Sequence, residues 1–211
     1  MSIQINYKNK GLKNPSVNLV LFTNENFDIN SLKKYISKIE FSYISELLKT
    51  SDLKKNLLFF EINSKKTIFL ISLKKDLTIS DIENLGGKFH SYINYDKKND
   101  YFINSDSLNS KIDNFIGHFL HGLKLKSYEF NIYKSKKKKK LISIGIVGKK
   151  NQISKKDQLK FKALEKGIFY ARDLVSEPGN VLHPDEYTKR LGSLKKDGLK
   201  ITVYDYKKMK K

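Results

Sequence analysis

Near the end of the 211-residue chain stands the segment Tyr170-Ala-Arg-Asp-Leu-Val-Ser-Glu-Pro-Gly-Asn-Val-Leu-His-Pro-Asp-Glu186. A helix is expected to run into it and to end at Pro178-Gly179, because proline cannot continue a helix. Pro184 suits the first turn of a second helix. The segment therefore predicts two helices joined by a short break. The first helix is supported by apolar residues at helical spacing, namely Leu159, Leu164, Ile168, Ala171 and Val175.

Toward the N-terminus, short apolar runs alternate with longer amphipathic ones up to about residue 150. This alternation predicts an α/β layer domain over residues 1–150. Asn63–Lys66 is short enough to join two of the strands as a hairpin. The segments expected to be strands are Ser2–Tyr7, Val17–Phe22, Leu57–Ile62, Thr67–Leu73, Tyr101–Asn104, Tyr128–Tyr133 and Leu141–Val147.

Three helices are expected between these strands. Gly86-Gly87 lies inside the second, where each glycine costs about 1 kcal/mol relative to alanine, so a close helix contact is expected there. Gly122 is expected to cap the end of the third. The helices are expected from Asn30 or Ser31 to Leu48, from Ser80 to Ile93, and over Ile112–Leu120.

Residues 151–211 are expected to begin with a connector at 151–154. Ser154 and Asp157 have the spacing of a capping pair for the helix that follows. The helix that begins at Pro184 is expected to end near Gly198. Leu199–Asp205 alternates apolar and polar residues and predicts a further strand.

Two segments resemble the leucyl (cytosol) aminopeptidase family. Gly122–Lys134 is similar to the family's glycine–leucine–leucine stretch and the strand after it. Ala163–Pro184 matches, nearly position for position, the family's Ala-Arg-Asp-Leu-Val-Asn-Glu-Pro, small residue, Asn-Val-Leu-Thr-Pro signature. Ser176 replaces the usual Asn, and His183 replaces the Thr that usually caps the helix, so that helix start is expected to be looser.

The resemblance implies a macro-like N-terminal domain with a mixed sheet flanked by helices over residues 1–150. Residues 151–211 would be the linker helix and the truncated start of the peptidase domain. The family's strand end near Ile71–Lys75 tends to carry glycine, which this chain lacks, so backbone amides there are poor candidates for holding a phosphate.

The resemblance also implies a hexameric exopeptidase that holds two zinc or manganese ions and removes N-terminal residues from peptides. The family's Asn-Thr-Asp-Ala-Glu-Gly-Arg metal motif does not occur in residues 1–211. No catalytic, cofactor-binding or metal-ligating residue is therefore expected in this chain, and it is expected to be inactive alone. Some members of the family bind DNA through their N-terminal domains.

Composition favours a cytoplasmic protein. The chain contains no Cys, its mean hydropathy is −0.52, and it shows neither an apolar signal-peptide core nor a run long enough to cross a bilayer. No membrane partner is expected.

A formal net charge of +20 leaves two interpretations open. One is a nucleic-acid-binding surface, because clustered cations gain from counterion release. The other is the codon bias of an A/T-rich genome, because only Arg172 and Arg190 are arginine and Asn and Ile are abundant. The lysine-rich run Lys134–Lys140 likewise reads as an exposed hairpin turn or as a phosphate-backbone contact.

Several polar residues are candidates for a catalytic or metal-binding site. Arg172, Asp173 and Glu177 could supply an anion clamp, an acid and a base, or they could fix the helix–turn–helix by ion pairs and capping. His118 and His121, three apart on a helix, could share a metal ion or could be helix-end histidines beside a C-terminal dipole. His90 and His183 are isolated, and no role is assigned to them.

Overall fold

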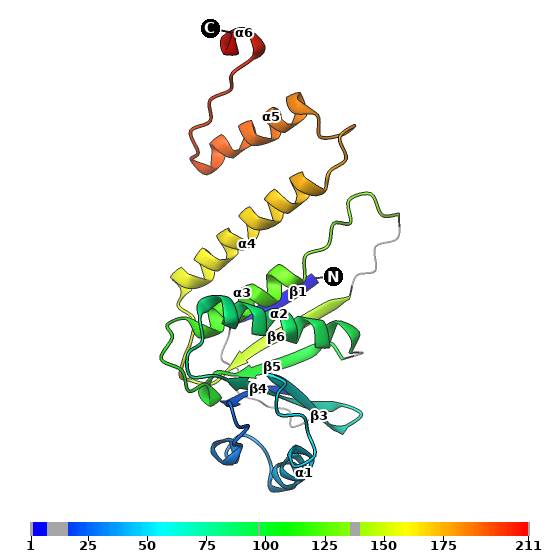
Figure 1. The fold of residues 1–211 in the computed structure, drawn as a ribbon, viewed down its shortest axis with the longest axis vertical. Coiled ribbons are helices and arrows are strands. Elements are labelled where there is room, and N and C mark those ends of the chain that lie inside the picture. The colour runs from blue at the N-terminus through cyan, green and yellow to red at the C-terminus, as the bar shows by residue number, and fades with distance from the viewer. Residues whose placement is uncertain (1, 8–16, 97, 136–139, 211) are drawn as a thin grey trace. The chain divides into compact units, whose positions relative to one another are not determined.

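The computed structural model describes residues 2–7, 17–96, 98–135 and 140–210. They form two compact units, residues 1–165 and residues 166–211 (Figure 1). Among the residues described, no helix is long and apolar enough to cross a membrane.

The first unit is built on a six-stranded sheet in the order β1-β6-β5-β2-β4-β3. All neighbours run parallel except β3, which pairs antiparallel with β4 at one edge. The predicted mixed α/β sheet is thereby confirmed. The strands span Ser2–Asn6 (β1), Asn18–Asn24 (β2), Leu57–Asn63 (β3), Lys66–Leu73 (β4), Asp100–Asn104 (β5) and Leu141–Val147 (β6).

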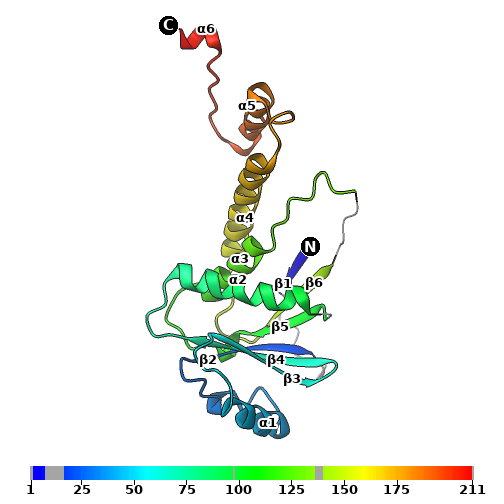
Figure 2. The same ribbon diagram turned by 45° about the vertical axis from the view of Figure 1, so that its right-hand side comes forward.

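Helices cover both faces of this sheet (Figure 2). Helices α2 (Ile79–Tyr95) and α3 (Phe115–Lys126) pack on one face, around a core that includes Phe22, Phe69 and Phe89. Helix α1 (Lys38–Leu48) packs on the other face, around a second core. Two short 3-10 helices span Asn30–Leu32 and Ser105–Ser107. Because α1 and α2 lie on opposite sides, β4 is buried along its whole length.

Helices α2 and α3 approach each other through glycine. A Cβ on Gly86 would lie 1.9 Å from the Phe119 carbonyl oxygen, and a Cβ on Gly122 would lie 1.9 Å from the Glu83 carbonyl oxygen. The close contact expected at Gly86 is present. The expectation that Gly122 ends a helix is wrong, because α3 continues to Lys126 and Gly122 serves the helix contact instead.

Other helix starts also differ from expectation. The region beginning at Asn30 forms only a 3-10 turn, and the long helix starts at Lys38, where Ser37 caps it. Helix α2 is capped by Thr78 and begins before Ser80. The prediction placed the caps at Asn30 or Ser31 and at Ser80, whereas Ser37 and Thr78 form the capping boxes.

The segment Tyr128–Tyr133 is not a strand. It was expected to pair with Leu141–Val147, but that strand, β6, already has β1 on one side and β5 on the other. Both hydrogen-bonding edges of β6 are therefore used.

The C-terminal part of the chain is helical. Helix α4 (Lys155–Ser176) spans the division between the units, and α5 (Pro184–Gly192), a 3-10 helix (Ser193–Asp197) and α6 (Tyr206–Met209) follow it. Ser154 caps α4 as expected, with its hydroxyl accepting the Asp157 N–H at 3.1 Å. His183 precedes α5 without a side-chain capping bond. Leu199–Asp205 forms no strand, contrary to expectation, and pairs with no strand among the residues described.

Candidate ligand-binding pocket

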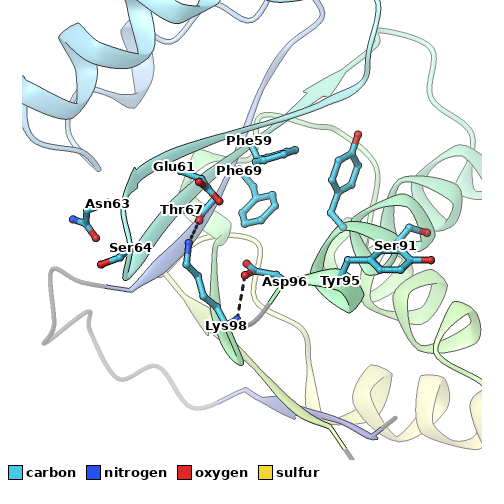
Figure 3. Close-up of a pocket in the computed structure, with 11 residues that line it drawn as sticks. Phe59, Glu61, Asn63, Ser64, Thr67, Phe69, Ser91, Tyr95, Asp96 and Lys98 are labelled. Carbon is cyan, nitrogen blue, oxygen red and sulfur yellow. Dashed lines mark hydrogen bonds between the residues drawn. The ribbon is translucent and has the colours of Figure 1, made fainter.

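A pocket of about 650 Å³ lies between the β3–β4 hairpin and the last turns of α2 (Figure 3). Its volume is in the range of small-molecule sites, about 300–1,000 Å³. The pocket stands at the end of the sheet where β4 and β5 begin.

One wall of the pocket is aromatic. Phe59 of β3 pairs with Phe69 of β4, and their ring centroids are 6.1 Å apart. Tyr92 of α2 meets Phe59 edge to face at 5.4 Å. The alternation of the strand explains this wall, since Phe60 points to the opposite face and is buried there. Phe59 is left 47% exposed and faces the pocket.

The other wall is polar. The Asp96 carboxylate accepts hydrogen bonds from the Lys98 backbone N–H at 3.1 Å and from the Tyr101 hydroxyl at 2.9 Å. Burial, together with the Asp96 carboxylate, raises the pKa of Tyr101, so this hydroxyl stays a donor. The Lys98 ammonium donates to the Thr67 hydroxyl. The arrangement fixes an anionic and a cationic group on the same side of the pocket.

Lys140 holds the end of α2 beside this pocket. Its ammonium donates to the carbonyl oxygens of Ile93 at 2.9 Å and Asn94 at 3.3 Å, and also to that of Asp96. A cation is favoured at a helix C-terminus, where the last carbonyls lack partners. Burial lowers the pKa of Lys140.

The sequence carried a signal for this pocket that residue chemistry alone did not reveal. Phe59 and Phe60 are consecutive in a strand, so their side chains point to opposite faces of the sheet. Tyr92 and Tyr95 are three apart near the end of α2 and therefore share a helix face. Only the hairpin and helix together bring these rings to one place.

The acid–base residues of the opening segment lie in the second unit. Glu177 accepts a hydrogen bond from the Arg190 guanidinium at 2.9 Å, and the Glu177 side chain is only 3% exposed. Arg190 also contacts Glu186 at 3.1 Å. Arg190 thereby ties the end of α4 to α5 across the break, a role that the sequence did not single out. The Glu177–Arg190 ion pair fits the structural alternative for Arg172, Asp173 and Glu177, in which ion pairs fix the helix–turn–helix.

His118 and His121 are not helix-end residues, contrary to that alternative. Both lie within α3, and their rings contact Phe161 of α4, with centroid distances of 5.1 and 5.6 Å. Glu83 comes within 3.5 Å of His118 Nδ1. Burial lowers the pKa of His121. Among the residues that the structure describes, no three His, Asp or Glu side chains are grouped to hold a metal ion.

Asp106 lies just beyond the carboxyl end of β5 and bonds to the turn that follows β6. Its Oδ1 accepts the backbone N–H groups of Lys149 at 2.7 Å and Lys150 at 2.6 Å. Gly148, with φ of +116°, makes the turn that aims both amides at this carboxylate. The hairpin-turn interpretation of the run Lys134–Lys140 is wrong, because Tyr128–Tyr133 is not a strand and β6 pairs with β1 and β5 instead. Positions 136–139 lie outside the described residues, and the phosphate-backbone contact stays a prediction.

The fold is that of leucine aminopeptidases. A variant of tomato leucine aminopeptidase superposes with a TM-score of 0.73 over 99% of this chain and 46% of its own, at 17% identity. Cytosol aminopeptidase from Coxiella burnetii superposes with a TM-score of 0.61, over 92% of this chain and 37% of its own, at 13% identity.

The sequence likewise resembles cytosol aminopeptidases, which confirms the resemblance first noted in Ala163–Pro184. A probable cytosol aminopeptidase of Bradyrhizobium sp. is 36% identical over 94 residues, covering 43% of this chain and 19% of the relative. Probable cytosol aminopeptidase 1 of Shewanella oneidensis is 28% identical over 149 residues, covering 70% and 29%. No family model matches the chain. The chain thus spans less than a third of the length of these curated relatives.

Proposed function

We propose that these 211 residues are the N-terminal part of a metal-dependent leucyl aminopeptidase, a cytoplasmic exopeptidase that removes N-terminal residues from peptides. The 36% identity to a probable cytosol aminopeptidase carries the proposal. The shared fold is consistent with it. In the complete protein two divalent ions, zinc or manganese, would activate a hydroxide for attack on the peptide bond.

The residues of this chain do not fit that metal pair. The Asn-Thr-Asp-Ala-Glu-Gly-Arg motif is missing from the sequence, and the described residues offer no three-ligand group. What this part contributes is the α/β domain and the helices α4 and α5. The 211 residues are therefore proposed to be inactive alone, and assembly into a hexamer would be a property of the complete protein.

Two measurements test the proposal. Sequencing the coding DNA beyond codon 211 is expected to show a reading frame that continues into lysine, aspartate and glutamate metal motifs. The product of that longer frame is expected to release leucine from leucyl-p-nitroanilide in a chelator-sensitive way, while the purified 211-residue chain is not. Chelator-sensitive release by the short chain, or an inactive long product, contradicts the proposal.

The net charge of +20 favours a second candidate, a DNA-binding or assembly module without catalysis. Non-specific binding to duplex DNA would then weaken steeply with salt, because each phosphate contact releases a counterion. A variant with serine at residues 136–139 is expected to show a shallower salt dependence. No binding at low salt removes the DNA function, and light scattering then tests for assembly alone.

A further inference from the structure

The pocket beside the β3–β4 hairpin lies at the amino ends of β4 and β5, whereas open α/β sheets usually bind ligands at the carboxyl ends of their strands. Three of its four aromatic side chains remain open to solvent, with Phe59 47%, Tyr92 37% and Tyr95 87% exposed, whereas Phe69 is buried behind them. A contiguous patch of exposed apolar side chains often marks a binding site, whereas single exposed apolar residues are common on any protein surface. The pocket therefore calls for a ligand with an apolar body.

The charges of the pocket restrict what else that ligand carries. Asp96 and Glu61 supply two carboxylates, and Lys98 supplies one ammonium group (Figure 3). Asp96 accepts two hydrogen bonds from the protein, and a carboxylate has about four acceptor positions, so it can accept more. A phosphate would meet two carboxylates, and a simple cation would meet Lys98. A ligand that carries both signs of charge fits the lining.

We propose that this pocket binds an α-amino acid, free or at the start of a short peptide, with a large apolar side chain. The side chain packs against Phe59, Phe69 and Tyr92. The α-ammonium group faces the carboxylates of Asp96 and Glu61, and the carboxylate or peptide carbonyl faces Lys98. Such molecules are products and substrates of an aminopeptidase. The pocket would therefore bind either the released amino acid or the N-terminus of a substrate peptide, and this role rests on the proposed function.

Calorimetric titration of the 211-residue chain with L-phenylalanine tests the chemistry. Saturable binding is expected, and it is expected to weaken about tenfold for N-acetyl-L-phenylalanine, which lacks the ammonium charge. If the ligand is a free amino acid, binding is expected to weaken about tenfold for L-phenylalaninamide as well, because the amide lacks the carboxylate charge. L-Phenylalanylglycine distinguishes the two sources, because tighter binding of the dipeptide indicates a peptide and tighter binding of phenylalanine indicates a free amino acid. Adenosine monophosphate serves as the anionic comparator.

Variants locate the binding. Phe59→Ala is expected to weaken phenylalanine about tenfold by removing one aromatic contact. Tyr204→Ala is the matched control, since Tyr204 is 65% exposed and belongs to the other unit. Glu61→Gln keeps the shape of an exposed side chain and is expected to weaken phenylalanine but not its N-acetyl form.

Several outcomes overturn the proposal. They are no saturable binding at millimolar phenylalanine, equal binding of the N-acetyl form, tighter binding of adenosine monophosphate, or equal effects of Phe59→Ala and Tyr204→Ala. None of these titrations needs catalytic turnover. The pocket proposal can therefore be overturned even if the longer protein hydrolyses peptides. If the 211-residue chain binds phenylalanine but the longer product has no peptidase activity, the pocket proposal stands and the proposed function is contradicted.

Discussion

Gly86 of α2 and Gly122 of α3 stand against each other's helix, each facing a backbone carbonyl of its neighbour. The space for a Cβ is closed on both sides, at 1.9 Å from the oxygen of Phe119 and 1.9 Å from that of Glu83. Backbone cannot move aside as a flexible side chain can. The distance between these helices is therefore set by main chain rather than by side-chain packing.

Gly86→Ala is expected to lower the free energy of unfolding by about 3 kcal/mol or more, because the added methyl group forces the helices apart. Gly87→Ala is the matched control one residue away, where the nearest atom to a Cβ is Lys126 Cβ at 3.7 Å. It is expected to stabilise the chain by about 1 kcal/mol through helix propensity. Urea unfolding measures both, and equal effects of the two variants would contradict the close contact.

The ion pair between Lys66 and Glu40 joins β4 to the start of α1. The ammonium and Glu40 Oε1 are 2.6 Å apart, and the side chains are 11% and 12% exposed. Lys66→Met is expected to cost about 1–3 kcal/mol of unfolding free energy, because it leaves a mostly buried carboxylate without its cation. The double variant with Glu40→Gln is expected to recover part of the loss, and additive single effects would show that the pair is not coupled.

The same pair makes stability depend on acid. Burial raises the pKa of Glu40, but hydrogen bonds from Lys66 and Ser37 outweigh it and leave that pKa below its ordinary value. The stabilisation is present above the pKa of the unfolded state and is lost as pH falls through the folded pKa. With Glu40→Gln this part of the acid-induced loss of stability is expected to disappear from a urea series below pH 5.

Arg190→Lys is expected to loosen the break at Pro178-Gly179, because one ammonium cannot hold Glu177 and Glu186 with the planar geometry of a guanidinium. Limited proteolysis should cut the variant faster between residues 177 and 183. Lys189→Met is the control, since the Lys189 side chain is 81% exposed and contacts Glu186 at 3.7 Å. Unchanged cutting of the Arg190 variant would show that the ion pairs do not hold this turn.

Two buried histidines make the first unit sensitive to weak acid. Burial lowers the pKa of both His90 and His121 below 6.5. The unfolded chain then binds protons first as pH falls, so stability drops as pH falls through the ordinary value of 6.5 toward the lowered pKa values. The double variant His90→Gln and His121→Gln should lose less stability over this interval. His183→Gln, at an exposed position, should lose as much as the unchanged chain.

Apolar runs predicted most of the sheet because burial alone decides those strands. β2 and β4 lie between helices on both faces, so each contains an unbroken apolar run, Leu19–Phe22 in β2 and Ile68–Ile71 in β4. Tyr128–Tyr133 also has a strand-like pattern, with apolar and polar residues alternating, but its expected partner β6 already pairs with β1 and β5. Whether a segment forms a strand also depends on which partner strands still have an unpaired edge, and the local sequence does not specify this.

The pocket could not be predicted from the sequence for a related reason. Its walls come from β3, β4 and α2, and its carboxylate, Asp96, follows a helix whose end is held by Lys140, more than forty residues later. Each residue alone looks like ordinary surface. The helix break at Pro178-Gly179, in contrast, was readable directly because proline and glycine act on their own backbone.

Asp106 stands at the carboxyl ends of β5 and β6, the end of the sheet opposite the pocket. An anion that came from solution to the amides of Lys149 and Lys150 would have to displace a carboxylate tethered in the same chain. A tethered group acts at an effective concentration that is about millimolar or higher for a flexible tether, and a fixed side chain gains further from being in place beforehand. The side chains of Lys149 and Lys150 are exposed, whereas their backbone N–H groups already have a carboxylate acceptor within the chain.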